Sequence, residues 1–376
     1  MINLFQPSLG EEELQSIKSV FESNWIGKGK LVAEFEKSFA NNLNCDATHF
    51  LSTTSCTEAI FLAAKVFDFQ LGDEIIVPSI SFPSIASSVK ESGADLILCD
   101  VDPYNLNVRA EDIEKVVTNK TKAVFITHYG GVPCDMDSIM EFCNRKGIFV
   151  IEDAACAVQS FYKGKACGTF GDMAMWSFDA MKTLTAGDGG MIYIKDLQKR
   201  KRAQELLYLG LPAQQKSGLD SSESKASNWW EFNINEYGRR AIMNDITAAI
   251  AIEQLKKLPG FLERRKEISV FYDKKLQNVG DLILPKWDYS TIKSSYYFYW
   301  IQTSKRDELA QHLLDNGIYT TFRYWPLHKV NLFSSDGLYE NSEKISDNTL
   351  NIPIHQGLTD SEINLIVNSI TKFFNR

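Results

Sequence analysis

The sequence lacks the features that mark secreted, metal-binding and membrane-spanning proteins. Its seven cysteines are scattered and include no C-x-x-C pair, which argues against a disulfide framework or a zinc site and is typical of free thiols in a reducing cytosol. No run approaches the roughly 18 apolar residues of a membrane-spanning helix. The first residues show no positive segment followed by an apolar run, so we expect no signal peptide, a cytoplasmic protein and no membrane partner.

The chain also lacks an excess of positive charge. It has 40 Lys and Arg against 48 Asp and Glu in 376 residues, a net charge of −8. A general nucleic-acid binder needs a basic surface, so we expect no nucleic-acid partner. The 44% hydrophobic and 23% charged residues are typical of a globular protein with a large core and exclude a disordered chain.

Short apolar runs alternate with helical patterns over the first two-thirds of the chain. Seven runs are candidate strands: His49–Leu51, Glu74–Val77, Asp95–Cys99, Ala123–Thr127, Ile148–Ile151, Met173–Phe178 and Met191–Ile194. The helical patterns between the first five are Thr57–Phe67, Ser84–Glu91, Ala110–Val117 and Asp137–Lys146. This alternation predicts the α/β fold class, with a mostly parallel seven-stranded sheet flanked by helices. A loop ending in Gly187–Gly190 joins the last two strands and would allow the seventh to run antiparallel.

The pattern changes after residue 210. Residues Gly210–Trp230 are rich in Gly, Ser, Gln and Lys and predict a mobile loop. Two helices are then predicted, Met243–Lys257 and Leu262–Leu276, joined at Leu258-Pro259-Gly260. A smaller α+β unit follows, with strands Tyr296–Thr303 and Tyr319–Arg323 and helices Arg306–Asn316 and Asp360–Phe374. We expect a large α/β domain over residues 1–258 and a small C-terminal α+β domain over residues 259–376.

Polar and aromatic residues follow five of the predicted strands. They are Ser55-Cys56-Thr57, Phe82, His128, Asp153 and the segment Ser177–Lys182. Ligands of open α/β sheets bind beyond the carboxyl ends of the strands. These residues are therefore the candidates for a site.

The segment Thr54–Glu58 has two interpretations that can hold together. Ser55 and Glu58 could form a capping box at a helix start. Free amides there, with the hydroxyls of Ser55 and Thr57, could also bind a phosphate dianion. The chain has no P-loop motif and no G-x-G-x-x-G after its first strand, which argues against nucleotide sites of those types.

Asp153 and Lys182 are the residues that could carry chemistry. Taken alone, Asp153 could cap the next segment and Lys182 could be a solvated surface lysine. A buried carboxylate could instead keep a heteroaromatic nitrogen protonated, and a lysine beside a cationic ring can act as nucleophile and base. With a phosphate-binding helix start and the aromatic Phe82, these residues form the set that pyridoxal phosphate requires.

Longer motifs extend this pattern over nearly the whole chain. They include SNWIGKGK, TTSCTEAIFLA, GDEIIVPSISF, IEDAACA, GTFGD, WSFDAMKTLTAGDGG, MNDITAAIAIEQL and FRYWPLH. In this order they resemble the blocks of the DegT/StrS-type sugar-nucleotide aminotransferases, which are fold-type I pyridoxal phosphate enzymes. The resemblance implies a homodimer with shared active sites at the subunit interface.

The resemblance also implies roles for individual residues around the cofactor. Lys182 would be the catalytic lysine that binds it covalently, Asp153 the partner of its pyridinium nitrogen and Phe82 the aromatic that stacks on its ring. The phosphate would be held by Ser55, Cys56, Thr57 and Ser177. Cys156 stands where relatives often have His or Gln near the cofactor's phenolic oxygen, and a thiol is a weaker hydrogen-bond donor.

Three further residues are implied by the same resemblance. Arg240, or less clearly Arg239, would reach the phosphate in the neighbouring subunit, the alternative being a solvated turn. Trp25 and His328 fall in segments that contact the sugar nucleotide in relatives, although His328 could instead be a buried structural histidine. No metal is expected.

The implied reaction is transamination by a ping-pong route. Glutamate would convert bound pyridoxal phosphate to pyridoxamine phosphate, which would aminate a nucleotide-linked 4-keto-6-deoxy sugar. Position C4 is expected because Pro7, EEEL and SNWIGKGK resemble the relatives that act there. Four alternatives stay open: amination at C3, a non-nucleotide keto sugar, a sugar dehydratase, in which histidine would replace Lys182, and a non-catalytic binding or regulatory relative.

Overall fold

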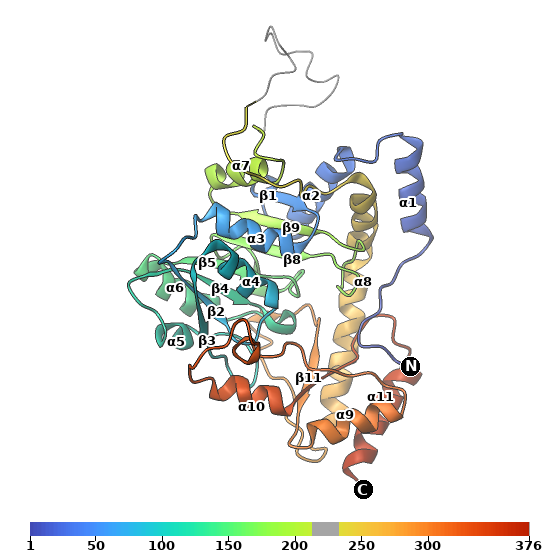
Figure 1. The fold of residues 1–376 in the computed structure, drawn as a ribbon. Helices are drawn as coiled ribbons and strands as arrows, with labels where there is room; N and C mark the ends of the chain where they lie inside the picture. Colours follow the sequence, from blue (N-terminus) through green and yellow to red (C-terminus); the bar gives the residue numbers. More distant parts are fainter. Residues whose placement is uncertain (213–232, 376) are drawn as a thin grey trace.

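The computed structural model describes residues 1–212 and 233–375. Most of the loop predicted over Gly210–Trp230 therefore lies outside the described residues. Within these ranges no helix is long and apolar enough to cross a membrane. Figure 1 shows a central sheet between helices, with one long helix running past it toward the C-terminal elements.

A seven-stranded sheet forms the centre of the first two-thirds of the chain, with the strand order β1-β9-β8-β5-β4-β2-β3. Its strands are β1 (Phe50–Thr53), β2 (Glu74–Pro78), β3 (Asp95–Cys99), β4 (Thr121–Thr127), β5 (Phe149–Asp153), β8 (Met173–Ser177) and β9 (Gly190–Ile194). Neighbours from β3 to β8 pair in parallel, whereas β9 is antiparallel to both β8 and β1. The predicted fold class is confirmed, including the antiparallel direction of the last strand.

Helices cover both faces of the sheet because its strands are apolar on both sides. Along β2, Ile75 and Val77 face one core and Ile76 faces another. The first core includes α3, α4 and α7, whereas α2, α5, α6 and the start of α8 pack on the opposite face. These helices are α2 (Lys30–Asn42), α3 (Cys56–Val66), α4 (Pro83–Ser92), α5 (Ala110–Glu114), α6 (Met136–Lys146), α7 (Leu197–Leu206) and α8 (Asp245–Leu276).

Helix α8 replaces the two helices predicted on either side of Pro259. The predicted break was wrong because the buried face continues across the proline. Leu255, Leu258 and Leu262 recur at helical spacing, whereas Pro259 is exposed. A proline inside a helix costs about 3 kcal/mol, but burial of each leucine returns about 1.5–3 kcal/mol. The division into domains at residues 258 and 259 stays a prediction.

The C-terminal part is built on the antiparallel pair β11 (Tyr299–Gln302) and β12 (Thr349–Ile352). Helices α9 (Arg306–Asp315) and α11 (Asp360–Phe374) pack with this pair and the end of α8 in a separate core. The predicted strand Tyr319–Arg323 was wrong, since only Thr321 forms a bridge, to Asn351. Beyond Thr321 the chain carries Arg323 and Tyr324 into a cavity instead of continuing the pairing.

Several elements were not predicted from the sequence. They are α1 (Glu11–Glu22), α2, α10 (Glu340–Asn348), β12, the small sheet of β6 (Phe161–Tyr162), β7 (Lys165–Ala166) and β10 (Ile292–Lys293), and the 3-10 turns η1 (Ala47–His49), η2 (Tyr129–Gly131) and η4 (Leu327–Lys329). The strands and 3-10 turns among them are only two to four residues long, and β10 and β12 pair with segments far away in the chain.

Candidate active site

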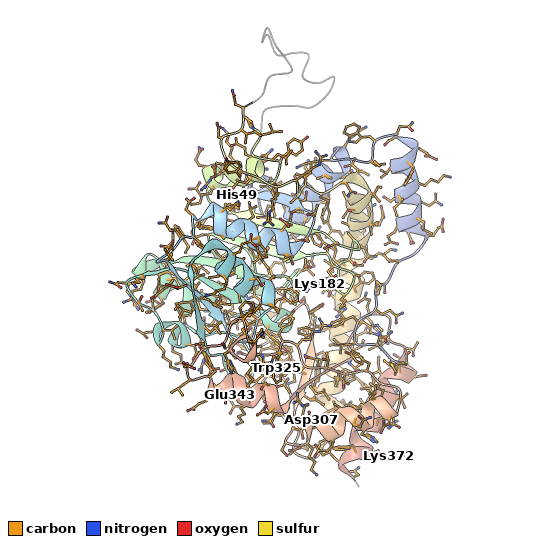
Figure 2. The ribbon with its side chains drawn as sticks, in the orientation of Figure 1. His49, Lys182, Asp307, Trp325, Glu343 and Lys372 are labelled. Atoms are coloured by element: carbon orange, nitrogen blue, oxygen red, sulfur yellow. The ribbon has the colours of Figure 1, made fainter. Side chains whose placement is uncertain are left out.

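A cavity of about 460 Å³ lies at the carboxyl ends of the parallel strands. It is lined by seven residues singled out from the sequence: Ser55, Cys56, Thr57, Phe82, Asp153, Ser177 and Lys182. These come from the starts of α3 and α4, the ends of β5 and β8, and the loop between β8 and β9. Figure 2 shows Lys182 near the middle of the molecule, between the sheet and the C-terminal elements.

The start of α3 presents free amides to this cavity. Ser55 is the N-cap, and its hydroxyl accepts the N–H of Glu58 at 3.1 Å. The N–H groups of Cys56 and Thr57 have no hydrogen-bond partner among the described residues. Gly190 keeps the backbone close, since a Cβ there would lie 2.8 Å from the Cys56 nitrogen. The N-cap predicted at Ser55 is thus present, but the reciprocal half of the capping box is not, because the carboxylate of Glu58 pairs with Arg239 at 3.3 Å. Binding of an anion by the amides of Cys56 and Thr57 stays a prediction.

Asp153 is a buried carboxylate at the end of β5. Its Oδ1 accepts the N–H of Ala155 at 3.0 Å, so it does cap the following turn. Burial raises the pKa of Asp153, while the Ala155 amide and the Lys182 ammonium act in the opposite direction. A carboxylate with so little solvation would be stabilised by a cation placed beside it in the cavity.

Lys182 sits in a turn in which its N–H donates to the carbonyl of Asp179 at 2.9 Å. Its Nζ lies 3.6 Å from Sγ of Cys156 and 4.7 Å from the ring centroid of Tyr297. Burial lowers the pKa of Lys182, but the acidic groups of Cys156, Tyr297 and Asp153 outweigh it, so the net direction is upward. By itself Lys182 is thus an ammonium, and a further cation beside it would lower its pKa.

Tyr324 connects two of the predicted residues. Its hydroxyl is 3.8 Å from Sγ of Cys156, and its ring packs edge to face with Phe82 at a centroid distance of 5.6 Å. Phe82 is 41% exposed, which leaves ring surface for a flat ligand. Tyr324, Tyr297 and Arg323 line the cavity but were missed from the sequence. The sequence feature that could have indicated them is the clustering of aromatic residues at 296–298 and 322–325, but such clusters are equally typical of a hydrophobic core.

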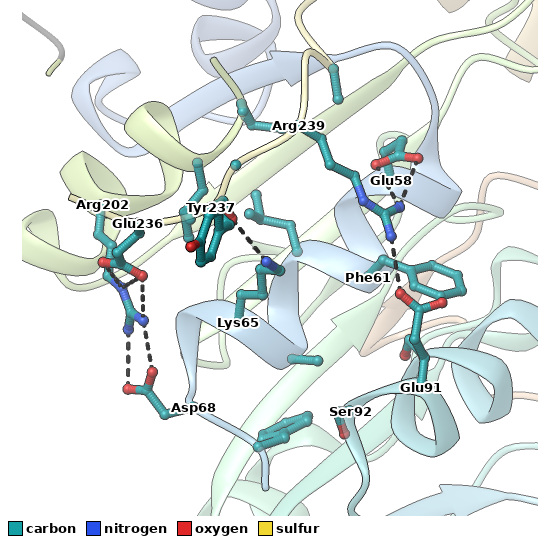
Figure 3. A pocket seen from close by; sticks show the side chains of 18 of the residues that line it. Glu58, Phe61, Lys65, Asp68, Glu91, Ser92, Arg202, Glu236, Tyr237 and Arg239 are labelled. Atoms are coloured by element: carbon teal, nitrogen blue, oxygen red, sulfur yellow. Dashed lines mark hydrogen bonds and ion pairs between the residues drawn. The ribbon is translucent and has the colours of Figure 1, made fainter. Parts of the chain in front are cut away.

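Arg239 and Arg240 differ in their contacts. Arg239 pairs with Glu58 at 3.3 Å and with Glu91 at 2.9 Å on the wall of a second cavity of about 530 Å³ (Figure 3). The guanidinium of Arg240 instead lies 5.3 Å from the ring centroid of Tyr208, and no carboxylate in residues 1–212 or 233–375 forms an ion pair with it. Neither arginine lines the cavity of Lys182. Of the two, Arg240 is the one without a carboxylate partner in the described part of the chain, and its role at a phosphate stays a prediction.

Trp25 and His328 also lie outside the lining of the Lys182 cavity. Trp25 is exposed, and its indole N–H donates to the carbonyl of Lys28 at 3.0 Å. His328 is buried, with Nδ1 2.7 Å from the hydroxyl of Ser79 and its ring stacked on Tyr339 at 4.3 Å. Burial lowers the pKa of His328. Its Nε2 lies 3.6 Å from the carboxylate of Glu343. The substrate roles of Trp25 and His328 stay predictions, as does the structural alternative for His328.

The profile described as the DegT/DnrJ/EryC1/StrS aminotransferase family matches residues 7–371. The chain belongs to this family. A relative from Saccharopolyspora spinosa, dTDP-4-dehydro-2,3,6-trideoxy-D-glucose 4-aminotransferase, is 46% identical over 99% of this chain and 96% of its own length. The crystal structure of the aminotransferase TlmJ from Streptoalloteichus hindustanus has a TM-score of 0.93 at 42% identity, covering 99% of this chain and 98% of the other. A putative sugar aminotransferase, Spr1654 from Streptococcus pneumoniae, solved in its PMP form, shares the fold with a TM-score of 0.91 at 24% identity, covering 100% and 99%.

The predicted family, the fold-type I architecture and the assignment as a sugar aminotransferase are therefore confirmed. The cavity of this aminotransferase also fits pyridoxal phosphate, the cofactor of its class. The unpartnered amides of Cys56 and Thr57 suit a phosphate, the poorly solvated carboxylate of Asp153 suits a protonated ring nitrogen, and the amine of Lys182 suits an aldehyde.

Glu152, beside Asp153 in this aminotransferase, is a fully buried carboxylate that the sequence did not single out. Its Oε1 accepts the N–H groups of Phe170 and Gly171 at 2.7 and 2.6 Å, and its Oε2 that of Gly168 at 2.6 Å. His128 completes the set at 3.0 Å; because its Nδ1 accepts the N–H of Cys134, its Nε2 carries the proton and donates to Oε2. The GTFGD segment is thereby fixed to β5 next to the site.

Glu152→Gln is expected to lower the free energy of unfolding by about 2–4 kcal/mol, because an amide NH₂ must then face N–H donors in place of an oxygen. Urea unfolding of the cofactor-free protein measures this difference. Glu114→Gln, at an exposed position on α5, is the matched control and should change stability by less than about 0.5 kcal/mol. Equal stabilities of the two variants would contradict the role of Glu152.

Proposed function

We propose that this aminotransferase transfers an amino group from glutamate, through pyridoxal and pyridoxamine phosphate, to C4 of a nucleotide-linked 4-keto-6-deoxy sugar. The proposal rests on one observation: Lys182, Asp153 and the residues at the start of α3 line the same cavity. The nature of the acceptor is supported by the relative that is 46% identical over nearly the whole chain and is named as a dTDP-linked 4-keto sugar 4-aminotransferase.

Pyridoxal phosphate, when bound, supplies an aldehyde for the amine and a ring that accepts electrons while its nitrogen stays protonated. The N–H groups of Cys56 and Thr57, with the hydroxyls of Ser55 and Ser177, would hold the phosphate at the start of α3. Asp153 would keep the ring nitrogen protonated, and Phe82 would cover one ring face. Cys156 would lie next to the phenolic oxygen, because its sulfur is only 3.6 Å from the amine of Lys182.

Lys182 would carry the proton that moves during each half-reaction. Its amine must first lose a proton, and a cationic ring beside it lowers its pKa toward the range in which an amine serves as a base. The walls formed by the buried Tyr297 and the half-buried Tyr324 would limit the access of water to this transfer.

The site would be completed in a homodimer. Leu14, Phe21, Trp25 and Ile26 expose more than half of their surface along the first 26 residues of the chain, an apolar set suited to a partner surface. Arg240 does not line the chain's own cavity and lies beside the ring of Tyr208, which is compatible with a phosphate in the neighbouring subunit. The segments of Trp25 and His328 would contact the sugar nucleotide.

The proposal is tested with protein loaded with pyridoxal phosphate, L-glutamate and dTDP-4-keto-6-deoxyglucose. We expect 2-oxoglutarate and an amino sugar nucleotide in equal amounts, with nitrogen on C4 by NMR. Nitrogen on C3 of a 3-keto substrate would favour C3 amination instead. Loss of water without incorporation of nitrogen would indicate a dehydratase. A failure to turn over 3-keto, 4-keto and non-nucleotide sugars, despite bound cofactor, would indicate a binding protein.

A further inference from the structure

Helix α2 begins without a cap of its own. Its N-cap residue, Gly29, has no side chain that could accept the free N–H groups of the first turn. The carboxylate of Asp245, at the start of α8, takes that place: its Oδ1 accepts the N–H of Gly29 at 2.9 Å and that of Val32 at 3.1 Å. Its negative charge also suits the positive end of the α2 dipole. Because Asp245 is buried, these backbone groups replace the water that would otherwise solvate its carboxylate.

The same residue fixes the loop of residues 25–29 that precedes α2, which we call the Trp25 loop. The N–H of Asp245 donates to the carbonyl of Gly27 at 2.9 Å, so its backbone and its side chain hold the loop at two points. A glycine is needed at position 29, because a Cβ there would lie 2.5 Å from Oδ2 of Asp245 and 3.0 Å from Cδ1 of Trp25. A serine at that position would cap α2 locally. The distant carboxylate does more, since it also ties the loop to α8.

The Trp25 loop presents an exposed aromatic ring. The indole N–H of Trp25 donates to the carbonyl of Lys28 at 3.0 Å, which fixes the orientation of the ring within the loop. Trp25 is nonetheless 56% exposed, and the neighbouring Ile26 is 54% exposed. An indole that is held along one edge and uncovered elsewhere has surface free to pack on a ligand, and little entropy is lost when it does so.

The segment that contains Asp245 also reaches the cavity at the start of α3. Four residues earlier, the carbonyl of Ala241 accepts the N–H of Thr54 at 3.0 Å and the hydroxyl of Thr53 at 2.7 Å. Thr54 directly precedes Ser55, which is the N-cap of α3 and lines the cavity. Hydrogen bonds therefore connect the Trp25 loop to the start of α8, and the segment just before α8 to the start of α3. Loss of the Asp245 contacts would change the position of the loop relative to the cavity.

We propose that Asp245 is a positioning residue for the sugar nucleotide: it holds the Trp25 loop in the shape in which the indole packs on that substrate. The inference rests on the proposed function, in which the segment of Trp25 contacts the sugar nucleotide. Asp245 does not line the cavity and acts only through the loop. Its effect is confined to the binding of the sugar nucleotide, and the glutamate half-reaction does not depend on it.

The test measures binding of the sugar nucleotide without turnover. Pyridoxal phosphate carries no amino group, so protein loaded with it binds dTDP-4-keto-6-deoxyglucose without aminating it, and calorimetry gives the dissociation constant. We expect Asp245→Ala to raise this constant about 20-fold, as the loss of an aromatic contact with a nucleotide would. The rate with L-glutamate, followed by the loss of visible absorbance, should stay within about twofold of the wild type. Asp245→Asn keeps one oxygen for the N–H groups of Gly29 and Val32 and should bind within about threefold of the wild type.

Two further variants link the effect to the loop. Gly29→Ala places a methyl group against Asp245 and Trp25 and should weaken binding of the sugar nucleotide in the same direction. It leaves every hydrogen-bonding group in place, so it tests the loop even if Asp245→Ala does not fold. Trp25→Ala should weaken binding about as much as Asp245→Ala, and the double variant should bind no more weakly than the weaker single variant, because both changes remove the same contact. Glu263→Ala, which removes an exposed carboxylate from the same helix, is the control and should match the wild type.

Each other outcome overturns the inference in a distinct way. Unchanged binding by Asp245→Ala would leave this residue only as a cap of α2. Additive losses in the double variant would show that Asp245 does not act through Trp25. Dissociation of a dimer in light scattering, with slowing of the glutamate half-reaction, would make the loop part of the subunit interface. A wild-type protein that neither binds nor aminates the sugar nucleotide would instead remove the proposed function itself, before any variant is compared.

Discussion

Lys182→Ala is expected to remove the visible absorbance of the cofactor-loaded protein and to lower kcat by at least about 10⁴-fold. The reason is that one side chain has two tasks at one place. Its amine lies in the cavity with Asp153, where it would bind the cofactor's aldehyde and then move the proton. Alanine supplies neither an amine nor a base. Absorbance spectra and steady-state formation of 2-oxoglutarate measure the two effects.

Two controls separate this loss from a general disturbance. Lys182→Arg keeps a cation of similar length, but a guanidinium stays protonated and does not attack an aldehyde, so it should fail as completely as alanine. Lys120→Ala removes an exposed lysine and should leave both measurements unchanged. An alanine variant at 182 that keeps its visible absorbance would contradict the assignment of this lysine.

Residues that follow strands in the first half of the chain could be predicted from sequence because their placement depends on local order. An apolar strand such as β5 ends at Asp153 and β8 ends at Ser177, and parallel strands bring their carboxyl ends to one edge. Both residues line the cavity with Lys182. The edge of the sheet at which such residues lie follows from the direction of the strands, and the alternation of strands and helices in a single sequence predicts that direction.

The far wall of the cavity could not be predicted because it depends on long-range packing. The sequence placed Arg323 at the end of a predicted strand and Tyr324 just after it. In the structure the backbone of Arg323 is instead held by hydrogen bonds to Asn351 on β12 and to Tyr129 after β4. No spacing in the sequence links these segments. The continuity of α8 across Pro259 has a similar cause, since leucines on the buried side outweigh the local cost of the proline.

Asp153→Asn is expected to lower kcat by about 10²–10³-fold while leaving the fold as stable as that of the wild type. The amide keeps the size of the side chain and an oxygen to accept the N–H of Ala155, but it carries no charge to keep a ring nitrogen protonated. The pKa of Asp153 is raised by burial, so its ionised form at neutral pH is less favourable in the folded state than in the unfolded one. Removing that charge should therefore not destabilise the cofactor-free protein. Turnover rates and urea unfolding at pH 7 give the two quantities.

The neighbouring Glu152 makes this a paired experiment on one strand. Both carboxylates are buried, but among the described residues Glu152 accepts four hydrogen bonds, whereas Asp153 accepts one, from Ala155, and lines the cavity. Converting each acid to its amide should therefore affect a different property. Glu152→Gln should lower the free energy of unfolding, whereas Asp153→Asn should lower the turnover rate. A destabilised Asp153→Asn protein that keeps its turnover within about tenfold of the wild type would show that this carboxylate only caps the turn after β5.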